Sequence, residues 1–468
     1  MRPDSTPHES RRRDQRGWYW YDWANSAYAT TVLAVFLGPY LTSVARNAAC
    51  GTTVTDANPC AVDDPRLHLL GLSVAPGAFY SYALTVSILV QVLVLPVTGA
   101  IADRSPHKKQ MLAGFAFVGA LATMGLYGVQ GDRYLLGGGL YLMANVAFGA
   151  SIVVYYSFLP QIAAADERDA VSARGWALGY LGGGVLLLAN LVLYSSRESL
   201  GLATADAVRI SLLSAGVWWG LFTLIPLTRL RNQTVHAGAT EVTPRVQESG
   251  GGTVVTAGFR QLRRTLVEAR SYPHTLKFLL AYLVYNDGIQ SVIALASIYG
   301  VEELDLEQST LISAILLVQF VAFLGALLLG RLALRFGAKR VILASLVLWA
   351  ATVGLAYFVQ EGATGQFYAL AALIGLVLGG SQALSRSLFS QLIPRGREAE
   401  YFGLYEISER GTSWLGALTF GLVFQLTGSY RNAIFSLVAF FVLGFVLLAR
   451  VDIRRAIREA GNEQPALV

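Results

Sequence analysis

The chain has 468 residues, of which 54% are hydrophobic and only 14% are charged, and its mean hydropathy is +0.49. Soluble proteins carry about 25% charged residues, so this composition excludes an ordinary soluble domain and indicates an integral membrane protein. The net charge of +6 comes mainly from arginines in short polar connections. That distribution favours membrane orientation over nucleic-acid binding, and no nucleic-acid partner is expected.

Twelve stretches of the sequence are long and apolar enough to cross a bilayer, which takes about 20 residues of helix. Because an open strand would leave backbone groups unpaired in lipid, each stretch is expected to be a helix. The predicted fold class is therefore an all-α membrane protein. The twelve stretches cover residues 20–44, 77–102, 110–130, 134–158, 175–195, 207–227, 277–299, 309–333, 340–359, 367–392, 401–426 and 431–450.

The basic residues are distributed unequally between the two sides of the membrane that these spans define. Of the 36 Lys and Arg residues, 28 fall on the side that holds both chain ends and 6 on the other, with Arg386 and Arg410 set aside as embedded or borderline. Since basic loops remain in the cytoplasm, both termini are expected to be cytoplasmic. The strong preference for Arg over Lys is typical of a GC-rich bacterial genome, which suggests a bacterial inner or plasma membrane.

The first span begins with a mixture of aromatic, acidic and amide residues. Trp18 and its aromatic neighbours are expected to form a belt at the membrane surface. Asp22 is expected near the helix start, where it would act as a helix cap or as part of a cytoplasmic gate. Asn25 lies one turn deeper on the same face, followed by Tyr28, and both are candidates for lining a substrate cavity.

The two cysteines, Cys50 and Cys60, lie between the first and second spans, on the predicted non-cytoplasmic side. An oxidising compartment favours a disulfide between them, and two free thiols are the alternative. Such a disulfide would staple the loop and take no part in chemistry.

Two pairs of segments and one pair of prolines repeat along the chain. The segment "GAIADRSPHKK" at 99–109 matches "GRLALRFGAKR" at 330–340, and "VSARG" at 171–175 matches "ISERG" at 407–411, while Pro160 matches Pro394. The near-constant separation indicates two halves of six spans each with parallel topology, which is the architecture of the major facilitator superfamily.

The first repeated loop resembles the loop signature of that superfamily, in which a glycine is followed by Asp-Arg and a basic cluster. The glycine would let two helices pack closely, and Asp103 could bind a base or the N-terminus of a neighbouring helix and latch the cytoplasmic side shut. The alternative is that the basic residues only anchor the loop at the membrane surface. Because Leu334 stands in place of the acid in the second copy, the stronger latch is expected on the N-terminal half. Arg174 and Arg410 are expected to guard the cytoplasmic mouth or to snorkel to the surface. The candidate gate residues are Asp22, Gly99, Asp103, Arg104, Lys108, Lys109, Arg174, Gly330, Arg335, Lys339, Arg340 and Arg410.

Polar side chains inside the predicted spans mark a candidate binding site, because ionisable groups cost at least about 2.5 kcal/mol there. Asp287, near the middle of the seventh span, is a candidate proton carrier or ammonium-binding group, with a structural ion pair as the alternative. Arg386 is expected to pair with a glutamate of the eleventh span. The pair could bind a substrate carboxylate, act as a cytoplasmic gate, or be purely structural. Asn145, Tyr155 and Tyr156 in the fourth span are weaker cavity candidates. The candidate substrate-binding or ion-binding residues are Asn25, Tyr28, Asn286, Asp287, Gln290, Gln382, Arg386, Glu406 and Glu409.

Four segments resemble one branch of the superfamily, the autophagy-related vacuole-effluxer-like family. They are "YDWANSAYAT" (21–30), "LVYNDGIQS" (283–291), "GGSQALSRSLF" (379–389) and "EYFGLYEISER" (400–410). The resemblance extends over essentially all twelve spans. Because fungal members of this family export amino acids from the vacuole, it implies a secondary transporter, with amino acids as the first substrate candidates.

The predicted organisation has five parts. These are a cytoplasmic tail (1–19), a six-helix bundle (20–227), a cytoplasmic linker (228–276), a second six-helix bundle (277–450) and a cytoplasmic tail (451–468). The first part of the linker, "ATEVTPRVQESGGGT", is typical of a flexible connection. Its second part, "FRQLRRTLVEAR", is basic and partly helical and could lie on the membrane surface.

The predicted function is alternating-access transport of a small polar solute, with protons as the candidate coupling ion. The sequence has no P-loop, so direct ATP coupling is not expected. A drug or sugar transporter of the same fold and a non-transporting membrane receptor are the alternatives. An enzyme is disfavoured, because the five histidines fall in predicted tails and loops without metal-ligand spacing. No cofactor and no metal site are expected, and the partners are a small-molecule substrate and the lipid bilayer, with the protein acting as a monomer.

Overall fold

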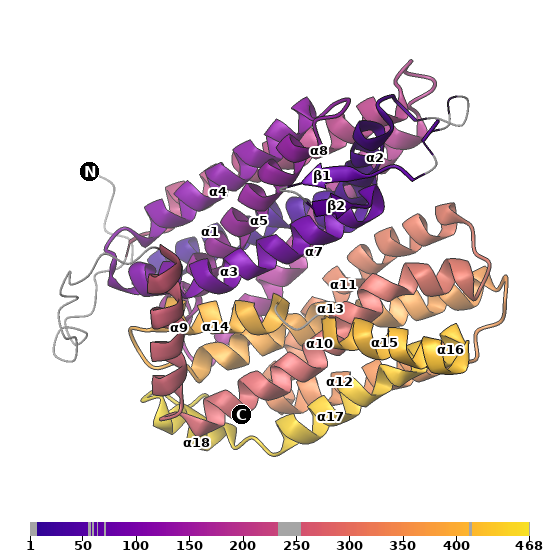
Figure 1. Ribbon diagram of the computed structural model, residues 1–468. Helices are drawn as coiled ribbons and strands as arrows, with labels where there is room; N and C mark the ends of the chain where they lie inside the picture. Colours follow the sequence, from indigo (N-terminus) through magenta and orange to yellow (C-terminus); the bar gives the residue numbers. More distant parts are fainter. Residues whose placement is uncertain are drawn as a thin grey trace.

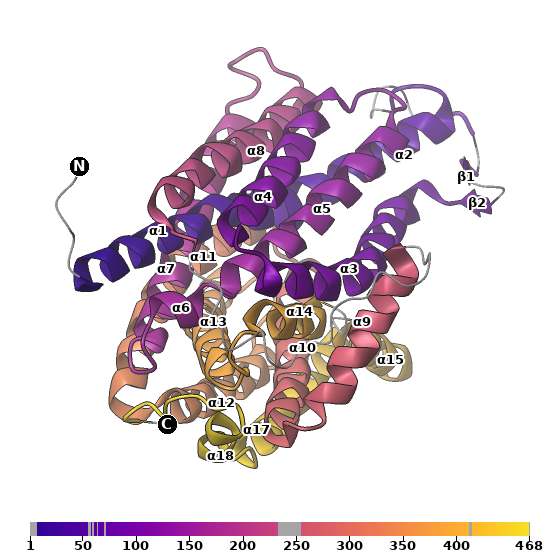
Figure 2. The ribbon, with the colours of Figure 1, turned by 90° about the vertical axis from the view of Figure 1, so that its left-hand side faces the viewer.

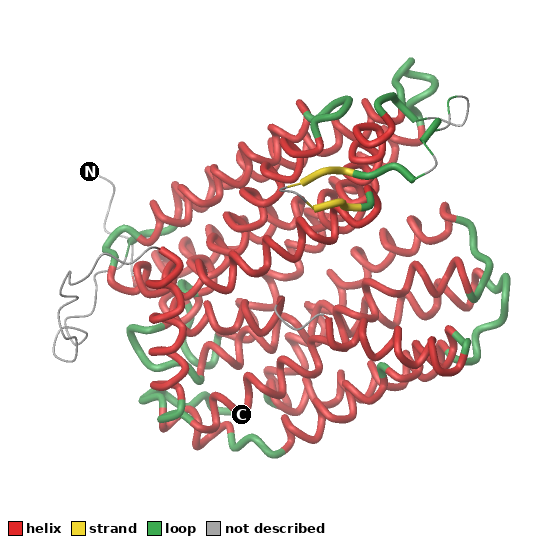
Figure 3. Tube along the Cα trace, in the orientation of Figure 1, coloured by secondary structure: helices red, strands yellow, loops and turns green. Residues whose placement is uncertain are grey.

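The computed structural model describes residues 7–54, 58, 60–62, 64–69, 72–232, 254–410 and 414–467. Within them the chain is almost entirely helical, with one short hairpin (Figures 1 and 3). The elements of the first part are α1 (Pro7–Ala27), a π-helical segment (Tyr28–Phe36), α2 (Leu37–Cys50), β1 (Leu67–Leu69), β2 (Leu72–Val74), α3 (Phe79–Arg104), α4 (Lys108–Gly125), α5 (Tyr134–Tyr156), α6 (Leu159–Ile162), α7 (Arg168–Ser195) and α8 (Thr204–Arg229). Those of the second part are α9 (Val254–Ala269), α10 (Pro273–Glu302), α11 (Gln308–Phe336), α12 (Ala338–Ala356), α13 (Thr364–Gln391), α14 (Glu398–Arg410), α15 (Trp414–Thr427), α16 (Tyr430–Ser436), α17 (Val438–Ala449) and α18 (Ile453–Glu459).

The long helices match the predicted spans. Eleven helical stretches in the described residues are long and apolar enough to cross a membrane. The remaining predicted span, 401–426, is covered by α14 and α15, with 411–413 between them outside the described residues. The predicted all-α membrane fold is therefore confirmed. The polar linker segment "ATEVTPRVQESGGGT" and Gly411 of the second "ISERG" copy also lie outside the described residues.

The helices gather in two sets, α1–α8 in indigo to magenta and α10–α18 in salmon to yellow (Figure 1). Between the sets, α7 lies against α11 and α13, and α3 lies against α14. Glycines permit two of these contacts, because a Cβ on Gly99 would overlap the Ala399 carbonyl and one on Gly330 would overlap Ala173. The two repeated loop segments thus begin at places where the two sets approach each other too closely for a side chain.

Two ends of the bundle are distinguished by what they carry. We call the end with the start of α1, the loop after α3, α9 and α18 the termini side, and Figure 2 views the molecule from that end. The opposite end, the disulfide side, carries the β1–β2 hairpin and a disulfide between Cys50 and Cys60, whose Cα atoms are 5.5 Å apart. The disulfide ties the end of α2 to the loop that leads into the hairpin.

Candidate functional site

A cavity of about 700 Å³ lies between the two sets of helices. Its apolar walls include Leu33, Leu84, Leu311 and Phe367, which lie toward the disulfide-side ends of their helices. The charged lining residues Asp22, Glu406, Glu409 and Arg410 lie toward the termini side, whereas Ser297 and Thr352 lie toward the disulfide-side ends of α10 and α12. Besides Phe367, the polar and aromatic residues that line it are Asp22, Asn25, Ser26, Thr30, Gln91, Asn145, Phe148, Tyr156, Trp176, Tyr180, Gln290, Ser297, Tyr299, Gln319, Thr352, Gln382, Glu406, Glu409 and Arg410.

Several cavity-lining polar groups have no hydrogen-bond partner among the described residues. They include Asn25 Nδ2, both polar atoms of Gln91, and Asn145 Oδ1, while Asn145 Nδ2 donates to Ser87 Oγ at 2.8 Å. Leaving a buried polar group unsatisfied costs about 1–3 kcal/mol, so such groups are retained where a ligand or water pairs with them. We refer to Asn25, Gln91 and Asn145, from three different helices, as the amide wall.

The opposite wall carries charge. Glu406 and Glu409 lie on α14, and Glu406 Oε2 accepts from Arg410 Nε at 3.0 Å, while Glu406 Oε1 has no partner in the described residues. The Arg410 guanidinium lies 4.9 Å from the ring centre of Phe148, on the other set of helices. Two carboxylates and one guanidinium on α14 therefore line the same cavity as the amide wall, which belongs to the other set of helices.

Arg386 does not line the cavity itself but forms an ion pair with Asp22, which does. It is fully buried on α13 and contacts Asp22 of α1, with Nη1 and Nη2 each 3.2 Å from Asp22 Oδ2. It also donates to the hydroxyl and the carbonyl of Ser172 on α7, each at 2.9 Å. The rings of Trp18, Tyr156 and Trp176 surround the guanidinium at 4.6–5.4 Å. Such packing favours a cation that has lost its water.

Two expectations for these residues are wrong. Arg386 does not pair with Glu406 or Glu409, because it projects from α13 toward α1 and α7, while Glu406 is held by Arg410 one turn along α14. Nor is Asp22 a helix cap, since α1 begins at Pro7.

The polar residues before Asp22 stay helical because they pack on other helices. Asp14 binds Arg231 at 2.8 Å, and Gln15 donates to the Ile162 carbonyl at 2.9 Å. Trp18 is buried and donates to the Tyr155 carbonyl at 2.9 Å, so it does not belong to a belt at the membrane surface. The second role expected for Asp22, a contact at a gate, stays a prediction, and the structure places Asp22 between the two sets.

Asp103 joins the end of α3 to the start of α14. Its two carboxylate oxygens accept the backbone N–H groups of Ala399 and Glu400, each at 2.9 Å, and Lys108 Nζ lies 3.1 Å away. An anion at the first turn of a helix satisfies free N–H groups and opposes the positive end of the helix dipole. This contact, like the Asp22–Arg386 pair, holds the two sets together on the termini side.

A second group of contacts links α7 to α13 at the same end. Arg168 donates to the Ser390 carbonyl at 2.9 Å, Ser172 to the Ala383 carbonyl at 2.6 Å, and Ser387 to the Asp169 carboxylate at 2.5 Å. The contacts of Asp22, Asp103, Arg168, Ser172 and Ser387 that link α1–α8 to α10–α18 all lie on the termini side. The structure therefore represents a state that is closed on this side.

The other candidate gate residues lie near this closure without forming the same contact. Arg104 donates to Ala100 of its own helix at 3.1 Å, and the Lys109 backbone N–H donates to Asn232 at 2.9 Å. Lys339 donates to the carbonyls of Ala449, the last residue of α17, and of Val451, at 2.9 and 2.7 Å. The remaining candidates, Arg174, Arg335 and Arg340, are exposed.

The candidates on α10 divide between the cavity and the space behind it. Gln290 lines the cavity, whereas Asp287 does not and instead accepts the Gly416 N–H at 2.7 Å. Asn286 does not line the cavity, but it contacts two residues that do. Its side chain accepts a hydrogen bond from Gln382 at 2.8 Å and donates one to the Glu409 carbonyl at 3.1 Å.

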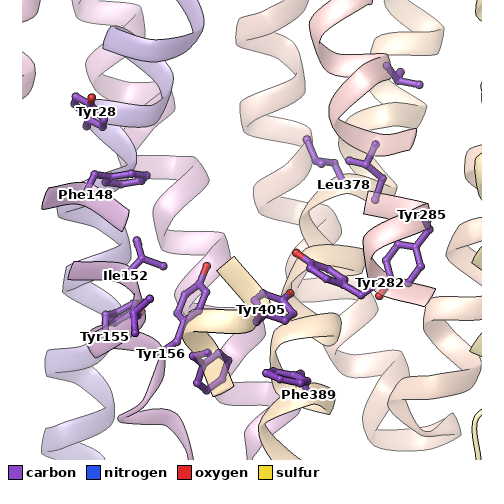
Figure 4. Close-up of a cluster of buried hydrophobic side chains, with 14 of the residues drawn as sticks. Tyr28, Phe148, Ile152, Tyr155, Tyr156, Tyr282, Tyr285, Leu378, Phe389 and Tyr405 are labelled. Carbon is purple, nitrogen blue, oxygen red and sulfur yellow. The ribbon is translucent and has the colours of Figure 1, made fainter. Parts of the chain in front are cut away.

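The aromatic candidates also divide. Tyr28 is buried between Phe148 and Trp219 within the first set and does not line the cavity. Tyr156 lines it and faces Tyr405 of α14, with ring centres 6.3 Å apart (Figure 4). Tyr156 therefore belongs both to the cavity wall and to the closure beneath it.

Gln91, Trp176 and Gln319 line the cavity and were not predicted as site residues. For Gln91 and Gln319 a signal was present, because each is a single amide in an otherwise apolar span. No such signal was present for Trp176, because a tryptophan near the end of a span is ordinarily assigned to the membrane surface.

The latch can be tested with the variant Asp103→Lys. A cation at this position would oppose Lys108 and the positive end of α14, so we expect the protein to open on the termini side. A cysteine replacing the buried Ser390 should then be alkylated about tenfold faster than in the parent protein. Asp132→Lys, in the α4–α5 connection, is the matched charge-reversal control. Loss of substrate affinity without faster alkylation would contradict the latch.

The sequence relatives are transporters. The family described as "Vacuole effluxer Atg22 like" matches residues 10–461. An uncharacterized MFS-type transporter of Bacillus subtilis (strain 168), YxiO, is 30% identical over 442 residues, covering 94% of this chain and 95% of the relative. Autophagy-related protein 22 of Kluyveromyces lactis is 26% identical over 478 residues, covering 96% of this chain and 95% of the relative.

Solved structures share the architecture. The fucose:proton symporter FucP of E. coli superimposes with a TM-score of 0.63 at 13% identity, covering 95% of this chain and 99% of that one. The proton:xylose symporter XylE gives 0.65 at 10% identity, covering 95% and 96%. At these identities the likeness shows the fold alone, which is that of the major facilitator superfamily. Together with the family match over nearly the whole length, these findings show that the chain belongs to the vacuole effluxer Atg22-like family and is a multi-pass membrane transporter of the major facilitator type, not an enzyme.

Proposed function

We propose that the protein is a secondary active transporter that moves amino acids through the central cavity by alternating access. Its two six-helix bundles, 20–227 and 277–450, would rock about the cavity, with the linker 228–276 joining them. It would act as a monomer in a bacterial plasma membrane with both termini in the cytoplasm. The termini side of the structure would then be the cytoplasmic side, closed by the Asp22–Arg386 pair and the Asp103 latch.

The observation that carries this proposal is the composition of the cavity walls. A volume of about 700 Å³ is in the range of small-molecule sites. The carboxylates of Glu406 and Glu409 suit a substrate ammonium, and Arg410 suits a carboxylate. The amide wall offers neutral donors and acceptors on the opposite side. Groups of both charges around one small cavity favour a zwitterion over an uncharged sugar.

Uptake and counterflow in proteoliposomes test this proposal. Vesicles loaded with one unlabelled amino acid should accumulate its labelled form, and a panel of amino acids should compete for this exchange. Exchange of sugars or lipophilic cations but not amino acids would establish the alternative transporter. Binding of a ligand without exchange of any solute would instead indicate a receptor.

Proton coupling is proposed to use a carboxylate that reaches the cavity. Glu406 lines it, whereas Asp287 lies behind it against the backbone of α15. We therefore expect Glu406→Gln to abolish the acceleration of transport by a pH gradient. Counterflow, which needs no gradient, should continue at a reduced substrate affinity, because one of the two carboxylates that suit the substrate ammonium is lost.

Asp287→Asn is the paired variant for the coupling site. If Asp287 carries the proton, this variant loses the pH response and Glu406→Gln keeps it. Flux of both variants measured across the same range of external pH separates the two assignments. An unchanged pH response in both would refute proton transfer at either residue.

A further inference from the structure

The helix α9 runs across the termini side of the bundle instead of along the long helices (Figures 1 and 2). It comes from the second part of the linker, packs along α3 and leads directly into α10. Thr265 and Ala269, one turn apart, are fully buried and mark the face that is turned toward the protein. The helix is therefore docked on the bundle and is not an independent linker segment.

Two side chains of α9 reach the start of α14. Thr265 donates its hydroxyl to the Glu400 carboxylate, and Glu268 forms an ion pair with Arg397. Arg397 in turn binds Glu400 at 2.7 Å, and the Glu400 backbone N–H donates to Asp103. Thus α9 packs on α3 of the first set and binds the turn of α14 that Asp103 holds.

The opposite face of α9 is basic and unpartnered. Arg260, Arg263 and Arg264 of α9 and Arg270, the residue after it, are all exposed, and none has a hydrogen bond or ion pair to any residue that the structure describes. Beside them Leu266 and Val267 are 45% and 53% exposed. A helix at the end of a membrane bundle that presents arginines together with exposed aliphatic side chains has the composition of a segment lying in the headgroup layer.

We propose that this exposed face of α9 binds the anionic lipid surface on the termini side and thereby stabilises the state in which that side is closed. Arginines near an anionic leaflet are attracted to it over about one Debye length. While α9 is held on that surface, Thr265 and Glu268 keep the start of α14 next to Asp103. Opening the termini side separates α3 from α14, so it must break these contacts or pull α9 away from the lipid.

The test uses the full-length protein in nanodiscs of phosphatidylcholine alone or with added phosphatidylglycerol. Spin labels on cysteines that replace His107, after α3, and Arg395, before α14, report the separation of the two sets. We expect phosphatidylglycerol to raise the ratio of closed to open protein about tenfold, and high salt to reverse this effect.

Replacing Arg260, Arg263, Arg264 and Arg270 together by glutamine should abolish the lipid response, and replacing all four by lysine should preserve it. As a matched control, Arg450→Gln with Arg454→Gln and Arg458→Gln removes charge elsewhere on the same side and should leave the response intact.

Thr265→Val separates lipid binding from its transmission to α14. This variant should retain phosphatidylglycerol in native mass spectrometry while losing part or all of the shift in distance. The proposal is overturned if phosphatidylglycerol does not change the distance distribution of the parent protein, or if the glutamine variant responds as the parent does. The second result would mean that the arginines face water or a soluble acidic partner.

Discussion

Replacing Arg386 with glutamine is expected to lower the free energy of unfolding by about 3–5 kcal/mol, because it leaves the Asp22 carboxylate in a buried site without its cation. The hydrogen bonds to Ser172 and the contacts with Trp18 and Tyr156 would be lost as well. Thermal unfolding of the purified protein in detergent measures the loss.

Two further variants show whether the buried charge is the cause. Asp22→Asn combined with Arg386→Gln should recover most of the lost stability, because no unpaired charge remains. Arg431→Gln breaks a partly exposed ion pair in which Arg431 Nε lies 2.6 Å from Glu303 Oε1. This variant should lower the free energy of unfolding by about 1 kcal/mol or less. A double variant that is as unstable as the single one would mean that the rings and Ser172, not the charge of Asp22, dominate the site.

Gln91→Leu is expected to weaken substrate binding and to leave the protein as stable as before or more stable. The two polar atoms of Gln91 are buried at the cavity without a partner in the described residues, so the empty protein bears the cost of that burial. A bound substrate that pairs with them would regain about 1–3 kcal/mol, and about 1.4 kcal/mol is tenfold in affinity. We therefore expect the dissociation constant to rise about tenfold, measured by counterflow competition.

Asn190→Leu provides the matched control for this effect. Asn190 is also a buried amide of a long helix, but it lies outside the cavity lining and accepts a hydrogen bond from Ser214 at 3.0 Å. Asn190 Nδ2 is also buried without a partner in the described residues, so this variant matches Gln91→Leu in burial and differs from it in position. Its replacement should leave substrate affinity unchanged. If Gln91→Leu follows the pattern of Asn190→Leu, the amide wall does not contact the substrate.

The spans and the repeat were readable from the sequence because they depend on properties that do not require tertiary structure. An apolar stretch of about 20 residues must be helical in lipid wherever it packs, and the repeated Gly99 and Gly330 segments are visible by alignment alone. The helix start was less predictable. Asp22 looked like a cap because residues 7–17 are polar, but Asp14 and Gln15 find partners on distant segments that extend α1 by several turns.

The sequence could not predict which side chains of one set of helices contact which side chains of the other. Arg386 has glutamates at similar depth on the neighbouring span, and nothing in the spacing shows that its side chain turns toward α1 and α7 instead. Asp287 illustrates the reverse case, since a carboxylate in a span need not face a cavity. It can accept a backbone N–H where α15 begins, beside residues outside the described part of the chain. Facing direction depends on helix rotation, and an aperiodic, uniformly apolar span does not define that rotation.

Because the polar contacts between the two sets lie on one side, the equilibrium between the two conformational states should depend on temperature. The state described here is held by ion pairs and hydrogen bonds on the termini side, while the disulfide-side end of the cavity is lined by Leu33, Leu84, Leu311 and Phe367. Closing that end would bury apolar surface from both sets and so carry a negative change in heat capacity. Because apolar association weakens on cooling, low temperature should favour the present state and warming should populate the other. The rate at which transport increases with temperature would then contain a conformational contribution in addition to that of the transport step itself.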